Sequence, residues 1–331
     1  MKNFKVILLL VVCLIISFNL SAFGSDQKYK IEPVQLTMGA GGMGGSWFVM
    51  ATALFSMFDE YIDGLEYTIV PGGGVANPIA IKQKNIDIGL AYTTNLWAAH
   101  NGKLEYEEPI ENIRGMAKLG MADVIHCFML SRAGINSIKE IAEKKTRLKL
   151  DTSTLGLSGE LGVKRMLELH GITYDDIKSW GGSVTHSSYQ EATDRLRDGH
   201  IDGFFNIEVV GKPLWTELTQ SVDATLLTQE EEALVQLVEK YGYDRAVIPA
   251  GTYKGQEKDI ATTSQEPVLV VDKDMDEELV YILTKLLFEH KDYLVTTYAT
   301  FKYLDINDAI PAQAPLHPGA ERYYKEVGVL K

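Results

Sequence analysis

Short apolar runs alternate with amphipathic segments along most of this chain. Runs rich in β-branched and aromatic residues predict strands, and they lie at 34–38, 65–70, 86–92, 148–150, 201–205 and 267–271. Apolar residues recur at helical spacing in several of the segments that follow these runs, such as 47–58 and 159–170. The long run 116–130 is expected to be one strand that leads into a second domain. Strands that alternate with helices are typical of an α/β architecture.

Glycine, threonine and asparagine gather where three of these strands end. The ends carry Gly39–Ser46, Pro71–Pro78 and Thr93–Asn95, and each is followed by a predicted helix. In open α/β sheets, ligands bind at the edge where the strands end and the helices start. We therefore expect a binding site that is built from these turns.

The first turn, Gly39–Ser46, contains Gly-x-Gly-x-x-Gly and precedes the helix at 47–58. Its geometry points unpaired backbone N–H groups and the positive end of a helix dipole at one place, where an anion is stabilised. A dinucleotide site would also need an acidic residue at the end of the next strand. That strand ends at Thr68–Gly72 without a carboxylate. A tight strand-to-helix connection without a ligand is the simpler alternative.

The second half of the chain repeats this arrangement. A predicted strand at 148–150 leads through residues 151–158, rich in hydroxyls, into a helix for which Ser158 is the expected N-cap. Similar segments also close each half, Asn85–Gly89 and His200–Phe204. Two similar α/β lobes that face each other across a cleft would explain the repetition. Residues 25–32 and 246–265 are polar, and we expect a short leader and an irregular segment there.

The first 24 residues have the three parts of a secretory signal peptide. Lys2 and Lys5 precede an apolar core at 6–18, and Ala22–Gly24 forms a small-x-small cleavage site. The core is short for a membrane span, although a retained anchor is the alternative. We expect a periplasmic protein whose mature chain starts near Ser25.

Size, charge and cysteine content narrow the class further. The chain has 331 residues and exceeds the usual size of a single core, which predicts two domains. Its net charge is −13, and it becomes −15 after cleavage because Lys2 and Lys5 are the only charged residues in the leader. Such an acidic chain is not a general nucleic-acid binder. Cys127 is the one cysteine beyond residue 24; it lies in an apolar run and is expected to be buried, so a catalytic thiol is the weaker alternative.

The residues offer little for catalysis or for metal binding. The seven histidines are scattered without a His-x-His or His-Glu-x-x-His pair, and there is no Gly-x-Ser-x-Gly elbow. What remains at the loop tips is a set of neutral donors and acceptors, which suit a polar solute that is bound without reaction. We therefore expect a binding protein without cofactor or metal rather than an enzyme.

Several spaced motifs also resemble one family. The matching segments are 39–48, 70–77, 86–90, 198–205, 248–256 and 316–324, in order along the chain. They resemble the TAXI-type solute-binding subunits of TRAP transporters. The resemblance implies a two-lobed periplasmic binding protein of the type 2 kind, with a cleft between lobes joined by crossing strands. It also implies a monomer that delivers a small carboxylate, such as a glutamate-like amino acid or a keto or dicarboxylic acid, to an ion-gradient-driven TRAP permease.

The expected division is a signal peptide at 1–24, lobe I at 25–124 and 246–331, and lobe II at 125–245. The backbones of Gly44–Ser46 and Ser158–Gly159 are expected to bind the carboxylate, while Asn77 and Thr93 orient the solute, and Tyr253 closes over the site from a linker. The full set of candidate ligand-binding residues is Gly44, Gly45, Ser46, Trp47, Asn77, Thr93, Thr94, Ser153, Ser158, Gly159, Asn206 and Tyr253. A sensor input protein for a membrane receptor and a secreted enzyme on the same scaffold are the alternatives.

Overall fold

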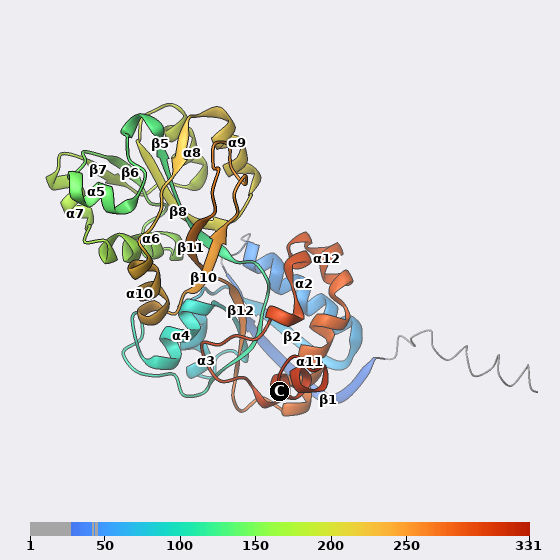
Figure 1. Ribbon diagram of the computed structural model, residues 1–331. Helices are drawn as coiled ribbons and strands as arrows, with labels where there is room; N and C mark the ends of the chain where they lie inside the picture. Colours follow the sequence, from blue (N-terminus) through green and yellow to red (C-terminus); the bar gives the residue numbers. More distant parts are fainter. Residues whose placement is uncertain (1–27, 42, 44–45) are drawn as a thin grey trace, which may run out of the picture.

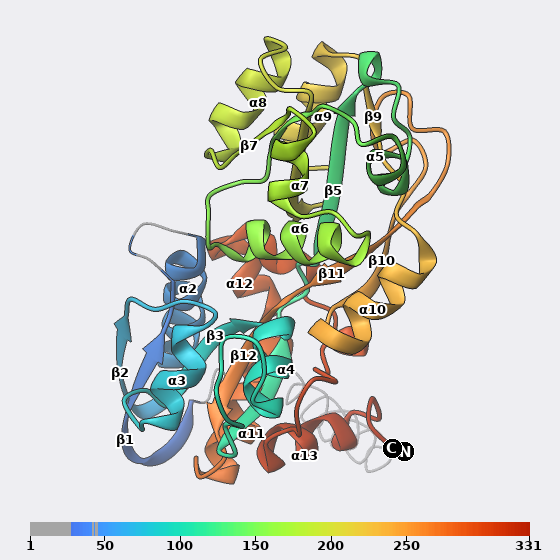
Figure 2. The same ribbon diagram turned by 90° about the vertical axis from the view of Figure 1, so that its left-hand side faces the viewer.

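The computed structural model of the chain describes residues 28–41, 43 and 46–331, which form two sheets with helices around each (Figure 1). The predicted signal peptide and three glycines of the first turn, Gly42, Gly44 and Gly45, lie outside the described residues. The first sheet with its helices is called the first lobe below, and the second sheet with its helices is called the second lobe. A view turned by 90° shows the two lobes stacked, with α6 (Ser158–Leu169) and α10 (Glu231–Tyr241) of the second lobe next to α4 (Thr93–Asn101) of the first (Figure 2).

The first sheet has the strand order β2-β1-β3-β12-β4. Its parallel part, β2-β1-β3, places the ends of these strands at one edge, as the strand–turn–helix pattern predicts. The strands are β1 (Tyr29–Gly39), β2 (Ile62–Val70), β3 (Ile88–Tyr92), β4 (Ile113–Lys118) and β12 (Pro267–Asp272). The helices are α2 (Ser46–Tyr61), α3 (Ala76–Lys82), α4 (Thr93–Asn101), α11 (Glu277–Glu289), α12 (Lys291–Thr297) and α13 (Pro318–Glu326), with short 3₁₀ turns η2 (Ala299–Tyr303) and η3 (Ile306–Asp308).

The second sheet has the order β10-β11-β5-β8-β6-β7, and β9 pairs with β5 at the side. Its strands are β5 (Asp123–Leu130), β6 (Lys149–Asp151), β7 (Ser183–Thr185), β8 (Gly203–Val209), β9 (Ala224–Leu226), β10 (Asp244–Ile248) and β11 (Ile260–Gln265). Around it lie η1 (Ser131–Ala133), α5 (Ile138–Lys144), α6 (Ser158–Leu169), α7 (Tyr174–Ser179), α8 (Tyr189–Arg197), α9 (Pro213–Ser221) and α10 (Glu231–Tyr241).

Each sheet is covered on both faces, and the alternation of side chains along its strands explains how. In β12, Leu269 and Val271 pack against α2 and α11, whereas Val268 and Val270 belong to the apolar cluster under α3 and α4. The second sheet is divided in the same way, with the core under α6 on one face and the core under α8 and α9 on the other. Full burial of one such side chain contributes about 1.5–3 kcal/mol, so these four clusters are the main source of stability.

Two neighbouring strands carry the chain between the lobes. The chain leaves the first sheet after β4 and enters the second at β5, and it returns from β11 directly into β12. β5 and β11 are antiparallel neighbours, with Asp123 opposite Gln265. A pair of crossing strands side by side is a natural hinge, because a small change in their backbone angles rotates one lobe against the other.

Several local predictions are corrected by the structure. Residues 29–32 are not a leader, because they form the start of β1 and pair with β2. The run 116–130 is split into β4 and β5 by Gly120, whose φ of +79° and close approach to the backbone of Tyr303 suit only glycine. Ser158 is the first residue of α6, and Leu157 holds the N-cap position.

The segment 246–265 is irregular only at 249–259, because the residues on either side of this loop form most of β10 and all of β11 in the second sheet. We therefore propose that the second lobe includes these strands and that the return to the first lobe lies at Glu266, about where β11 gives way to β12. β5 begins at Asp123, so the expected division after 124 falls within its first residues, and the division stays a prediction.

Candidate functional site

A cleft of about 760 Å³ lies between the two lobes. It is lined by the beginning of α2 and the end of β3 in the first lobe, by the beginning of β5, and by the end of β8 with the loop after it in the second lobe. The segment around η2 closes one side. The lining residues are Ser46, Trp47, Tyr92, Met121, Asp123, Leu157, Tyr189, Ile207, Glu208, Val209, Val210, Gly211, Lys212, Pro213, Pro267, Tyr298, Ala299, Thr300, Lys302 and Tyr303.

Aromatic rings form much of the cleft wall. Trp47 in the first turn of α2 packs against Tyr92 at the end of β3, with ring centroids 4.8 Å apart and planes inclined by 54°. Tyr189 lines the cleft from the second lobe, and its hydroxyl donates to the carbonyl of Ile207 at 2.8 Å. Such faces contact apolar parts of a solute and also attract cations.

The carboxyl group of Asp123 stands where the chain crosses into the second lobe. Its Oδ2 accepts a hydrogen bond of 3.0 Å from the hydroxyl of Tyr92. Burial, reinforced by repulsion from Glu208, raises the pKa of Asp123 to about 8. No lysine, arginine or histidine within the described ranges forms an ion pair with Asp123. This carboxyl is therefore available to a solute.

A second acid in the cleft, Glu208 at the end of β8, is already neutralised. It forms an ion pair with Lys212, and its Oε1 accepts from the backbone N–H of Val209 at 3.0 Å. The Lys212 ammonium also lies 5.7 Å from the centre of the Tyr189 ring. Lys302 supplies another cation at the cleft edge. The cleft thus presents groups of both charges.

Ser46 and Trp47 are the candidates from the first glycine turn that the structure places in the cleft. Ser46 is the first residue of α2 and is exposed, and Trp47 follows it at the wall. A helix start that opens toward a cavity offers unpaired N–H groups to an anion. The predicted use of Gly44 and Gly45 lies outside the described residues and stays a prediction.

Asn77 is buried and fully occupied by the protein itself. Its Nδ2 lies 2.7–2.9 Å from the carbonyl oxygens of Gly39, Ala40 and Leu90, and its Oδ1 accepts from the N–H of Gly73. The side chain ties the ends of β1 and β3 to the second glycine turn, and it is not part of the cleft lining. In this structure it shapes the turns rather than faces a solute.

Thr93 and Thr94 lie at the hinge and are also buried. The Thr93 hydroxyl accepts from the N–H of Glu266 at 3.2 Å, and the Thr94 hydroxyl donates to Oε1 of Gln265 at 3.0 Å. Both side chains hold the beginning of α4 to the returning strand. They are not in the cleft lining, because α4 starts at Thr93 and turns these side chains toward the crossing segment.

The candidates of the second lobe gather just behind the cleft wall. Ser153 is 1 % exposed with a left-handed φ of +70°, and its Oγ has no hydrogen-bond partner in the part of the chain described. A Cβ placed on Gly159 would lie 3.1 Å from the Tyr189 hydroxyl and 3.9 Å from that Oγ. Ser158 and Gly159 begin α6 next to Leu157, a lining residue. These residues neighbour the site rather than line it.

Asn206 in β8 is the most unusual of the predicted residues. It is completely buried opposite His126 of β5, and neither its amide nitrogen nor its amide oxygen has a hydrogen-bond partner among the described residues. A buried unpaired polar group costs about 1–3 kcal/mol. The cost is consistent with an amide that serves a bound molecule, although Asn206 is not in the cleft lining.

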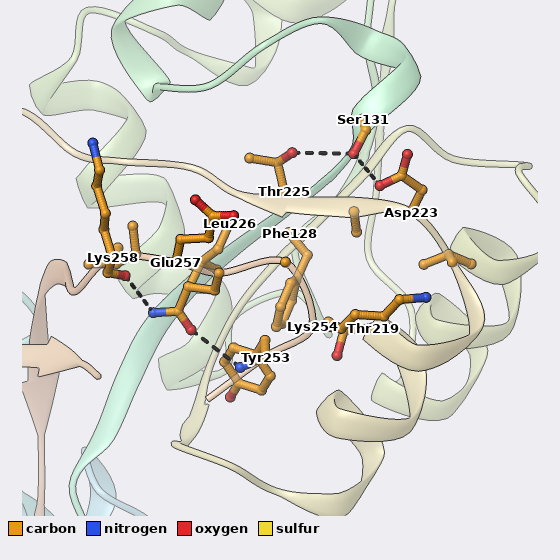
Figure 3. Close-up of a pocket in the computed structure, with 15 residues that line it drawn as sticks. Phe128, Ser131, Thr219, Asp223, Thr225, Leu226, Tyr253, Lys254, Glu257 and Lys258 are labelled. Carbon is orange, nitrogen blue, oxygen red and sulfur yellow. Dashed lines mark hydrogen bonds between the residues drawn. The ribbon is translucent and has the colours of Figure 1, made fainter. Parts of the chain in front are cut away.

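Tyr253 is not in the cleft lining, because it lies in the loop between β10 and β11 of the second lobe and not in a linker between the lobes. Its ring lines a separate pocket of about 550 Å³ together with Phe128 (Figure 3). The hydroxyl of Tyr253 accepts from the N–H of Gly211 at 3.1 Å and contacts Nε2 of His126 at 2.8 Å. At the same pocket the Ser131 hydroxyl donates to the carboxylate of Asp223 at 2.9 Å and lies 3.3 Å from the Thr225 hydroxyl (Figure 3).

The sequence did not indicate Asp123, Glu208 or Tyr189 as site residues. Asp123 and Glu208 are single acids far apart in the sequence, and the pairing of β5 with β8 brings them together, with Val124 opposite Glu208. An isolated acid at the edge of an apolar run, as at position 123, is the one pattern that could have indicated the site.

Three negative findings concern residues 28–41, 43 and 46–331 alone. No group of three or more acidic, histidine or cysteine side chains is arranged to hold a metal ion. No helix has both the length and the apolar composition needed to cross a membrane. Cys127 is buried and unpaired, and burial raises the pKa of its thiol, as expected for a residue without a chemical role.

Comparison with known proteins gives a family and a fold. The NMT1-like family profile matches residues 38–328. Among solved structures, a TctC solute binding protein from Polaromonas is similar, with a TM-score of 0.51 and 15% identity, covering 84% of this chain and 89% of that one. PhnD1 from Prochlorococcus marinus, in complex with methylphosphonate, has a TM-score of 0.51 and 12% identity, covering 89% and 99%. The predicted two-lobed α/β fold of solute-binding proteins is confirmed.

Proposed function

The chain belongs to the NMT1-like family, and we propose that it is an extracytoplasmic receptor that captures a small organic carboxylate between its lobes and delivers it to a membrane transporter. The observation that carries this proposal is the cleft of about 760 Å³, which both lobes line. Sites for small molecules usually measure about 300–1,000 Å³. A compact solute would touch both lobes at once and would hold them together.

The carboxylate would bind at the beginning of α2. Ser46 marks the N-terminal end of a 16-residue helix, where unpaired N–H groups and the helix dipole favour an anion. The overall charge of −13 repels anions, so attraction must be local. PhnD1, which shares the fold, holds the small anion methylphosphonate.

Capture would follow from rotation about the crossing strands β5 and β11. Thr93 and Thr94 fix α4 to the end of β11 near Glu266, so the first lobe would move as one body. The solute makes its full set of contacts only when the lobes approach, and it therefore shifts the population toward the closed form. A transporter can distinguish the closed form from the open form by shape.

The narrower proposal is that the transporter is a TRAP permease driven by an ion gradient. The support is the resemblance of segments such as 70–77 and 248–256 to TAXI-type receptors. The charged start and the apolar core of residues 1–24 support export. Export predicts that the mass of the exported protein corresponds to a chain that begins near Ser25. Co-purification with a permease from membranes would support transport, whereas co-purification with a receptor kinase alone would favour the sensor alternative.

A thermal-shift screen over amino acids, keto acids and dicarboxylates tests the function. A solute that binds only the folded protein raises its melting temperature by mass action. We expect at least one carboxylate to do so, and chromatography to return that solute unchanged after long incubation. A screen in which no small carboxylate binds would overturn the proposal, and conversion of the solute would favour an enzyme.

A further inference from the structure

We infer that Asp123 receives a positively charged nitrogen of the solute, so that the receptor selects molecules that carry both a carboxylate and a cationic group. This inference rests on the proposed function, because it takes the cleft as the solute site. It adds a specificity-determining residue and divides the candidate solutes into two classes.

The position of Asp123 is fixed by its neighbours rather than by flexible loops. It is the first residue of β5, opposite Val209 of β8 and Gln265 of β11. The Tyr92 hydroxyl holds one carboxyl oxygen, Oδ2, at 3.0 Å, and the other oxygen has no hydrogen bond from any described residue. One oxygen is therefore oriented by the protein, and the second is left for a donor from outside.

The charges around Asp123 leave room for one more cation. The groups that face it are Tyr92 of β3, Tyr189 of α8, Glu208 of β8, Lys212 of the following loop and Glu266 between β11 and β12. Lys212 is paired with Glu208, and Glu266 is paired with Lys118. Asp123 has no such partner in the described chain. A half-buried carboxylate without a counter-ion is costly, and a cationic ligand would remove that cost.

The aromatic walls favour the same class of ligand. Trp47 and Tyr92 form one wall close to Asp123, and Tyr189 faces the cleft from the other lobe. The face of an aromatic ring attracts an ammonium group, and this attraction grows when water is excluded. Closure of the lobes would exclude water from this place.

A carboxyl that is protonated in the empty protein must lose its proton when it accepts a cation. Burial and repulsion from Glu208 raise the pKa of Asp123 to about 8, so the group is mostly protonated at pH 7. When the ion pair with the solute forms, the Asp123 carboxyl would release its proton to the buffer. Binding of a cationic solute is therefore expected to release up to about one proton per protein.

Matched pairs of solutes test the inference, because an amino acid and its 2-oxo acid differ in the charged nitrogen. We would titrate L-glutamate against 2-oxoglutarate, L-alanine against pyruvate and L-leucine against 4-methyl-2-oxopentanoate by calorimetry. We expect the amino acid of any pair that binds to bind about thirtyfold or more tightly than its oxo acid. The substitution Asp123→Asn should abolish this preference, and Asp223→Asn, the same change in the separate pocket, should leave it intact.

The number of protons released on binding is measured on the unchanged protein. This test therefore remains decisive if Asp123→Asn does not fold. Calorimetry at pH 7 in two buffers of different ionisation enthalpy gives the protons released. We expect release with the amino acid and none with the oxo acid. Equal affinity within the pairs, or no proton release with a bound amino acid, overturns the inference while the receptor function stands. A failure of every carboxylate and amine to bind would overturn the receptor function itself.

Discussion

The hydroxyl of Tyr253 lies 2.8 Å from Nε2 of His126, and both side chains are buried in the second lobe. Nδ1 of His126 lies 3.0 Å from the carbonyl of Val124, which can only accept, so Nδ1 carries the proton and Nε2 accepts from Tyr253. The same hydroxyl accepts from Gly211 of the cleft wall. This chain of hydrogen bonds links β5, the cleft loop and the β10–β11 loop through a neutral imidazole.

A fall in pH should decrease the stability of the folded protein through His126. Burial lowers the pKa of His126 to about 4 in the folded protein, against about 6.5 when unfolded. Because the unfolded chain then binds the extra proton, stability is complete above about pH 6.5 and falls as the pH decreases toward 4, by up to about 3 kcal/mol. Urea unfolding across this range measures the loss. His126→Phe should flatten the profile, and replacement of the exposed His200 by Asn should not; an unchanged profile in His126→Phe would contradict the assignment.

A rise in pH should destabilise the folded protein through Asp123, whereas a fall in pH destabilises it through His126. The raised pKa of Asp123, about 8, means that the folded protein binds a proton which the unfolded chain has already lost above about pH 4. Stability therefore decreases from pH 4 toward pH 8. We expect Asp123→Asn to equal the parent near pH 4 and to be the more stable protein at pH 9, as judged by melting temperature. A variant that is less stable than the parent at pH 9 would show that the carboxylate is stabilised in the fold.

Asn77 should matter for folding more than for recognition. Asn77→Ala removes the partner of three carbonyl oxygens and of the Gly73 N–H, and we expect a loss of about 1–3 kcal/mol in the free energy of unfolding. Asn85→Ala is the matched control, because Asn85 is exposed and its side chain bonds to no described residue except Gln83. Chemical denaturation measures both. Full stability combined with lost affinity would instead place Asn77 in contact with the solute.

Trp47 should matter for solute affinity more than for the stability of the fold. Its ring is partly exposed at the cleft wall against Tyr92, so Trp47→Ala should lower solute affinity by about tenfold or more with a small effect on melting temperature. Trp180→Ala, a similar truncation outside the cleft lining, should leave affinity unchanged. Calorimetry with the solute found by screening compares them, and equal affinities in the two variants would count against the cleft.

Much of the fold is predictable from the sequence because the buried strands are continuous apolar runs. β12 and β3 were located within a few residues for this reason. The apolar pattern does not predict β11, because four of its residues, Thr262, Thr263, Ser264 and Gln265, are polar yet buried. Two of these polar side chains find partners far away in the sequence: the Thr262 hydroxyl donates to the carbonyl of Ile125, and the Gln265 amide oxygen accepts from the Thr94 hydroxyl. No local pattern reveals such long-range partners.

The candidate site was harder to predict for a related reason. The first turn predicts Ser46 and Trp47, which line the cleft, because a glycine turn before a helix is a local feature; their contact with a solute stays a prediction. Asn77, Thr93 and Thr94 bond to the protein itself, and residue type alone does not show whether an amide or a hydroxyl faces a solute or a backbone carbonyl. Asp123 and Glu208 meet through strand register, which lies beyond local sequence.

The most direct test of the account is a crystal structure of the protein saturated with the solute that the screen identifies. The account predicts an intact solute between Trp47 and Tyr92 on one side and Tyr189 on the other, with its carboxylate at the beginning of α2 and the lobes closer together than in the empty protein. A solute bound outside the cleft, for example beside Phe128 and Tyr253, or one that is chemically altered, would contradict it.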